Sequence, residues 1–101
     1  MTGGMNYAIH DLMTRTVTIF EGDRDIAVGS VTDGCIHDVE VAMEYRRHGY
    51  GTTLVKSLML LGGSWMWVAA SNMPAISLYS SLGFRIIETD GGYYRMQLDS
   101  Q

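Results

Sequence analysis

Two arginines, a histidine and two glycines lie together near the middle of this 101-residue chain, in the stretch Arg46-Arg47-His48-Gly49-Tyr50-Gly51. An alternating apolar pattern precedes the stretch and leucines at helical spacing follow it, so we predict a strand-to-helix turn. The first amides of a helix have no intrahelical acceptor and carry partial positive charge. Glycines let a ligand approach the backbone closely. The pattern therefore predicts an anion site, most naturally for a phosphate or diphosphate.

The elements before and after this turn follow from hydrophobic period and turn residues. Alternating, β-branched segments predict an antiparallel hairpin of residues 16–21 and 26–31 and a third strand over residues 35–42. Residues 7–9 are a candidate extra strand within an N-terminal segment, 1–13, that the pattern determines poorly. A helix is predicted from residue 52 to its stop at Gly62-Gly63. Its apolar positions are Leu54, Val55, Leu58, Leu60 and Leu61.

The C-terminal part continues with an apolar run over residues 65–70, which predicts a buried strand parallel to the one before the first helix. A second helix is predicted to begin after Asn72, as its N-cap, and to end at Gly83. Strands 84–88 and 93–98 form a final hairpin. The order β-β-β-α-β-α-β-β predicts one α/β (α+β) domain over residues 1–101, with two helices and a mixed, mostly antiparallel sheet.

Composition narrows the classes of function. The formal net charge is −4, so general electrostatic attraction to nucleic acid is not expected. The single cysteine, Cys35, excludes an intramolecular disulfide, and His10, His37 and His48 lack metal-ligand spacing, so no metal site is predicted. No apolar run approaches the ~20 residues that span a bilayer, and no secretory signal is recognised. We expect a cytoplasmic protein that binds neither nucleic acid nor membrane, with a homodimer as an open alternative.

Two segments resemble the signature of the GNAT superfamily of N-acetyltransferases. Residues 46–51, Arg-x-x-Gly-x-Gly, resemble the acyl-CoA pyrophosphate motif, and residues 72–84, Asn-x-x-Ala-x-x-Leu-Tyr-x-x-x-Gly-Phe, are similar to the second helix and the strand after it. The helix and strand between the segments also match the family, and the resemblance covers residues 16–98. The departures are Met43 in place of a frequent proline, Arg47 in place of a frequent glycine, and a chain too short for the two helices usual between the first two strands.

The resemblance implies that acetyl-CoA is the cosubstrate. In the family, the pantetheine arm pairs with strand amides like an added strand, which implies contacts near Val39, Val41 and Met43. Asn72 would bond the pantetheine through its amide, beside its role as an N-cap. The residues implied for the diphosphate are Arg46, Arg47, His48, Gly49, Tyr50, Gly51 and Thr52. Without the resemblance, the basic residues would be interpreted as a solvated turn.

Transfer to an amine also needs proton management. Tyr79 aligns with the tyrosine that many family members use to protonate the departing thiolate, although by pattern alone it is a core aromatic. Two residues are candidates for the general base: His37, four residues before Val41 where many members have glutamate, and Glu40, acting through a water. A structural role for His37 is the alternative. Strand alternation predicts Asp38 and Glu40 on one face of the sheet and His37, Val39 and Val41 on the other.

The resemblance therefore implies an N-acetyltransferase in which a primary amine attacks the thioester of acetyl-CoA directly, without an acyl-enzyme. The acceptor is a protein lysine or N-terminus, or a small amine. The missing helices motivate one alternative, a catalytically degenerate acyl-CoA-binding module.

Overall fold

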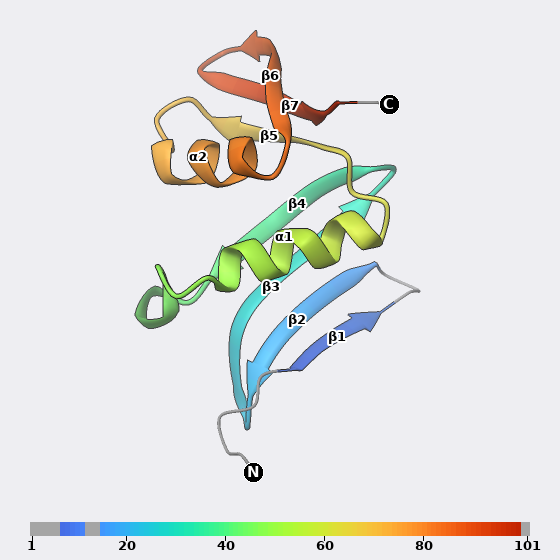
Figure 1. Cartoon of the computed structure of the whole chain (residues 1–101), viewed down its shortest axis with the longest axis vertical. Helices are drawn as coiled ribbons and strands as arrows, with labels where there is room; N and C mark the ends of the chain where they lie inside the picture. Colours follow the sequence, from blue (N-terminus) through green and yellow to red (C-terminus); the bar gives the residue numbers. More distant parts are fainter. Residues whose placement is uncertain (1–6, 12–14, 100–101) are drawn as a thin grey trace. The chain divides into compact units, whose positions relative to one another are not determined.

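Seven strands and two α-helices account for most of the residues that the structure, a computed structural model, describes: 7–11, by their backbone, and 15–99 (Figure 1). They fall into two compact units that divide between Gly63 and Ser64. Each unit is described by itself. None of the helices in the described residues has the length and hydropathy needed to cross a membrane.

The first unit is an antiparallel meander with one helix packed on it. Its strands are β1 (Tyr7–Asp11), β2 (Thr16–Glu21), β3 (Arg24–Thr32) and β4 (Cys35–Val41). A 3-10 turn, η1 (Met43–Tyr45), leads into the helix α1 (Tyr50–Leu60). The candidate strand at residues 7–9 is thus confirmed as β1.

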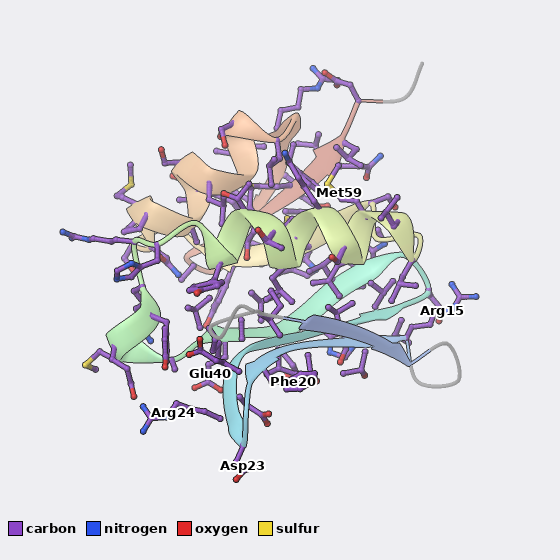
Figure 2. The ribbon with its side chains drawn as sticks, turned by 60° about the horizontal axis from the view of Figure 1, so that its bottom comes forward. Arg15, Phe20, Asp23, Arg24, Glu40 and Met59 are labelled. Carbon is purple, nitrogen blue, oxygen red and sulfur yellow. The ribbon has the colours of Figure 1, made fainter. Side chains whose placement is uncertain are left out.

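One face of this sheet forms the core of the first unit. Leu54, Val55 and Leu58 of α1 are fully buried, and α1 packs against β2 and β3. The strands supply Val17, Ile19, Ala27, Val31 and Ile36 to the same core. Figure 2 shows Phe20 and Glu40 on the other side of the sheet, away from α1. Leu60, another apolar residue of this helix, is 81% exposed, because it lies two residues after Leu58 and therefore on the opposite side of the helix.

The second unit is a three-stranded antiparallel sheet with one helix. Its elements are β5 (Trp65–Ala69), α2 (Met73–Ser81), β6 (Phe84–Asp90) and β7 (Tyr93–Leu98), and β7 lies between the other two strands. Ile76 and Tyr79 are the buried residues of α2. The Tyr79 ring meets Phe84 edge-on, with ring centroids 6.1 Å apart. Met66 and Met96, register partners on β5 and β7, are also buried.

The α+β class and the order of the elements are therefore confirmed, and strand β2 has the predicted bounds. The described strand pairs within each unit are antiparallel. The expected parallel pairing of the strands on either side of α1 involves both units and stays a prediction. So does the single domain over residues 1–101.

Candidate functional site

The predicted anion site lies at the start of α1. The helix begins at Tyr50, two residues earlier than predicted, and its N-cap is Gly49, in the left-handed conformation with φ 85° and ψ 0°. Gly51 and Thr52 therefore lie in the first turn, where the amides have no acceptor within the helix. Gly49 offers no side chain to cap them. The start of α1 thus presents amide donors and the positive end of the helix dipole.

The surroundings of Gly49 suit a diphosphate. A Cβ added at Gly49 would meet no atom within 4 Å among the described residues, so the backbone there can be approached closely. Arg46, Arg47 and His48, which come directly before it, are exposed. Amide donors, two guanidinium groups and open space are what a diphosphate requires. These residues therefore fit the diphosphate of an acyl-CoA.

Several contacts hold the loop before α1 in shape. The Nε of Arg46 donates to the carbonyl oxygen of Val41, 3.0 Å away, which ties the loop to the end of β4. The rings of Tyr45 and Tyr50 meet edge-on across the loop, with centroids 5.8 Å apart. Sequence analysis assigned Arg46 only a charge and overlooked Tyr45. Two tyrosines flanking a basic, glycine-containing loop were the available signal.

Strand β4 contains a bulge that changes which residues share a face. In the register with β3, Glu40 pairs with Val28 and His37 pairs with Ser30, so Asp38 and Val39 together oppose the single residue Gly29. Register partners share a face of the sheet. His37 and Glu40 therefore lie on the same face, the one away from α1.

The predicted alternation along β4 was wrong for this reason. Val39 lies on the α1 face, where its Cγ2 is 3.3 Å from a Cβ built on Gly29. Val41 pairs with the buried Ala27 and shares that face. His37 therefore lies on the opposite face of the sheet from Val39 and Val41, and on the same face as Glu40. The signal available in the sequence was the pair of polar residues, His37 and Asp38, between the apolar Ile36 and Val39, which interrupts the strict alternation.

His37 is hydrogen-bonded through both of its ring nitrogens. Its Nε2 is 2.8 Å from the Oγ1 of Thr32, and its Nδ1 is 2.8 Å from the Oδ2 of Asp38. The His37 side chain is 38% exposed, so the group is accessible from solvent. Sequence analysis overlooked Thr32, which is the last residue of β3. The tight turn at Asp33 and Gly34, both with positive φ, brings β3 back beside β4.

The second unit holds the two remaining candidates on α2. Asn72 is the N-cap, and its Oδ1 accepts a hydrogen bond of 3.3 Å from the amide of Ala75. Tyr79 lies seven residues later, two turns along the same side of the helix. It is 7% exposed, and burial raises the pKa of its hydroxyl above the ordinary value. The hydroxyl is therefore held in its protonated form.

The structure thus brings the candidates together in three groups. Residues 46–52 surround the start of α1, His37 and Glu40 share a face of β4, and Asn72 and Tyr79 share a side of α2. Met43 lies in η1 with its side chain 76% exposed. Since Asn72 and Tyr79 belong to the second unit, one site formed by all three groups stays a prediction.

Known proteins resemble this chain in sequence and in fold. The model of the acetyltransferase (GNAT) family matches residues 13–84. An N-alpha-acetyltransferase of Saccharolobus solfataricus is 35% identical over 71 residues, which cover 63% of this chain and 42% of that protein. The chain therefore spans less than half of that relative.

Solved structures share the fold. PH1933 from Pyrococcus horikoshii OT3 has a TM-score of 0.76 and 23% identity, covering 85% of this chain and 65% of that one. The PaiA N-acetyltransferase from Thermoplasma acidophilum, solved in complex with coenzyme A, has a TM-score of 0.67 and 20% identity, covering 84% of this chain and 60% of that one. Since the family model matches well over half of its residues, the chain belongs to the GNAT family of acetyltransferases.

Proposed function

We propose that this chain is an N-acetyltransferase that uses acetyl-CoA and binds its diphosphate at the start of α1. The observation that carries the proposal is the left-handed Gly49 at the N-cap, with open space at its Cα and exposed basic residues beside it. Membership of the GNAT family supports it. The PaiA neighbour, solved with coenzyme A, supports the choice of ligand.

The pantetheine arm would run along the end of β4. Val39, Val41 and Met43 are the residues proposed to contact it, with strand-like hydrogen bonds to backbone groups. Asn72 would contribute its side-chain NH2, since its Oδ1 already caps α2. Acetyl-CoA supplies a reactive thioester, and the protein supplies position and proton transfer.

The proposed transfer is a direct attack by the amine. A C–N bond forms to the thioester carbon, the C–S bond breaks, and a backbone amide near Val41 stabilises the charge on the oxygen. His37, or a water held by Glu40, takes the amine proton. The side chains of His37 and Glu40 lie on the same face of β4, which supports a base at this position. Tyr79 returns a proton to the thiolate, for which its raised pKa keeps the hydroxyl protonated at neutral pH. Such acid–base groups each contribute about 10²- to 10⁴-fold in rate.

For the acceptor we propose the α-amine of a protein or peptide. The support is the 35% identical N-alpha-acetyltransferase. A protein lysine and a small polyamine are the competing acceptors, and the experiment includes both.

The test combines binding and turnover. The chain is incubated with acetyl-CoA and one of three acceptors: a peptide with a free N-terminus and no lysine, the same peptide blocked at its N-terminus with one lysine added, and a diamine. Thiol release and mass spectrometry report transfer, and calorimetry reports acetyl-CoA binding. We expect acetylation of the first peptide. Transfer to the lysine peptide or the diamine alone would overturn the acceptor, and binding without any transfer would favour an acyl-CoA-binding module.

A further inference from the structure

Strand β6 is an edge of the second unit's sheet, and it carries exposed apolar residues. In the strand order of this unit, β5-β7-β6, its one neighbour among the described strands is β7. Every residue from Arg85 to Asp90 is exposed, and Ile86 and Ile87 are 45% and 47% exposed. An edge strand presents backbone N–H and C=O groups with which another strand can pair. The outer side of β6 is therefore a place where a further strand can be added.

A bulge in β6 changes which of its charged side chains share a face. Arg85 pairs with Gln97 on β7. Glu88 pairs with Arg95, so Ile87 is an extra residue in β6. Arg95 and Gln97 lie two residues apart on β7 and share a face. Because register partners also share a face, Arg85 and Glu88 lie on the same face although they are three residues apart.

This bulge allows two copies of β6 to pair with matching charges. Two antiparallel copies of one strand are related by a two-fold axis, and here the axis passes through the bulge, which counts as one position of the ladder. Arg85 of each copy then lies opposite Glu88 of the other copy, on one face. Ile86 and Ile87 of the two copies meet at the axis. In a regular strand Arg85 and Glu88 would point to opposite faces and could not be paired in this way.

Both charged groups are available for such a contact. Glu88 is exposed and makes no ion pair within the described part of the chain. The Nε of Arg85 contacts the Oδ1 of Asp99, while the Arg85 side chain stays 69% exposed. The N–H groups of its two terminal nitrogens are left to donate to a carboxylate of the other copy. Charges and bulges also protect edge strands from pairing, but protection does not require that opposite charges match across a two-fold axis.

We propose that the outer edge of β6 binds β6 of a second copy of this chain, antiparallel, with Arg85 opposite Glu88. The two three-stranded sheets join into one continuous sheet across the axis. Opposite charges and apolar side chains directly across a strand pair both stabilise it. A sheet of three strands is close to the smallest that is stable in water, so the second unit gains from the extension. This interface is independent of the proposed acetyl transfer.

Charge reversals test the pairing. Sedimentation velocity over a series of protein concentrations should show a concentration-dependent dimer of the wild type. Arg85→Glu and Glu88→Arg each place like charges opposite one another at two points, so each should raise the dimer Kd about tenfold or more. Asp23→Arg is the matched control, since it also replaces an exposed acidic residue by arginine, at the tip of the β2–β3 hairpin (Figure 2), and it should keep the wild-type Kd. A wild type that stays monomeric at every soluble concentration would overturn the proposal.

A mixture of the two reversed chains distinguishes contact between copies from an effect within one chain. When one Arg85→Glu chain pairs with one Glu88→Arg chain, opposite charges again face each other at both points. The mixture should therefore dimerise about as tightly as the wild type, although each variant alone does not. Hydrogen exchange of residues 84–90 should also slow in the wild-type dimer. A mixture that dimerises no better than its components, or a wild-type dimer without protection of β6, would overturn the proposed pairing.

Discussion

The glycine at the start of α1 offers the sharpest test of where the cofactor binds. Gly49 and Gly22 are both exposed, both have positive φ, 85° and 59°, and a Cβ at either would meet nothing within 4 Å. Gly22 lies in the turn between β2 and β3, away from the proposed diphosphate site. Alanine at the two positions therefore makes a matched pair, in which only Gly49→Ala adds a methyl group where the diphosphate is proposed to bind.

The two variants should lose similar stability and differ in affinity. The left-handed conformation costs an L-residue about 1–2 kcal/mol, so the free energy of unfolding should fall by about that amount in both. No steric clash adds to this cost at either position. A hydrogen bond to a charged group contributes about 1.5–3 kcal/mol, so displacing the diphosphate from one amide should raise the Kd for CoA about 10- to 100-fold. Only Gly49→Ala should show that rise.

Urea denaturation measures the first quantity and isothermal titration calorimetry with CoA the second. Titration well below the unfolding transition keeps both variants folded, so that lost stability is not mistaken for lost affinity. Equal affinity of the two variants for CoA would refute the placement of the diphosphate at the start of α1. A loss of stability confined to Gly49→Ala would refute the conformational argument.

Three further changes test other parts of the structure. Tyr79→Phe should lower kcat about 100-fold with little change in the KM for acetyl-CoA. Because burial raises the Tyr79 pKa, the tyrosine ionises first in the unfolded chain, and the wild-type protein should lose stability above pH ~10. Urea titrations at alkaline pH should show a smaller loss in the variant. Gly63→Ala should lower the unfolding free energy by about 1–3 kcal/mol, since its Cβ would lie 2.9 Å from the carbonyl oxygen of Leu58; an unchanged denaturation midpoint would contradict this. Asn72→Asp should keep the N-cap of α2 and weaken CoA binding. Asn72→Ala should weaken CoA binding and also lower the free energy of unfolding by about 1 kcal/mol, because the cap is lost. An aspartate variant that binds CoA as tightly as the wild type would exclude a contact from the Asn72 amide.

Local chemistry explains how much of the fold could be predicted. Turn residues and the alternation of apolar residues predicted the observed bounds of β2 and β7, and Asn72 and Gly83 marked the ends of α2. These signals act within a few residues, so they survive in the sequence. The start of α1 was harder to place, because Tyr50 and Gly51 are weak helix formers and the left-handed Gly49 alone decides where the helix begins.

In the candidate site, too, the parts set by local sequence could be predicted and the parts set by strand pairing could not. The anion site is made of consecutive backbone amides, and a short motif was enough to predict it. The surroundings of His37 depend on the register between β3 and β4, which joins residues through a turn and a bulge. Thr32 became visible only once that register was known, since no spacing in the sequence singles it out.

The bulge itself suggests that Asp38 is kept for its side chain. Ile36 and Val39 both face α1, three positions apart, and the extra residue between them is Asp38. A strand without Asp38 would place Val39 opposite Gly29, Glu40 opposite Val28 and His37 opposite Ser30 by simple alternation, with every apolar residue on the same face as now. Packing therefore does not require the extra residue. We expect deletion of Asp38 to leave the free energy of unfolding unchanged or higher, because the left-handed residue is removed, and to lower kcat because His37 loses its partner. A large loss of stability in urea denaturation, with kcat retained by the remaining folded protein, would show instead that the bulge serves the sheet.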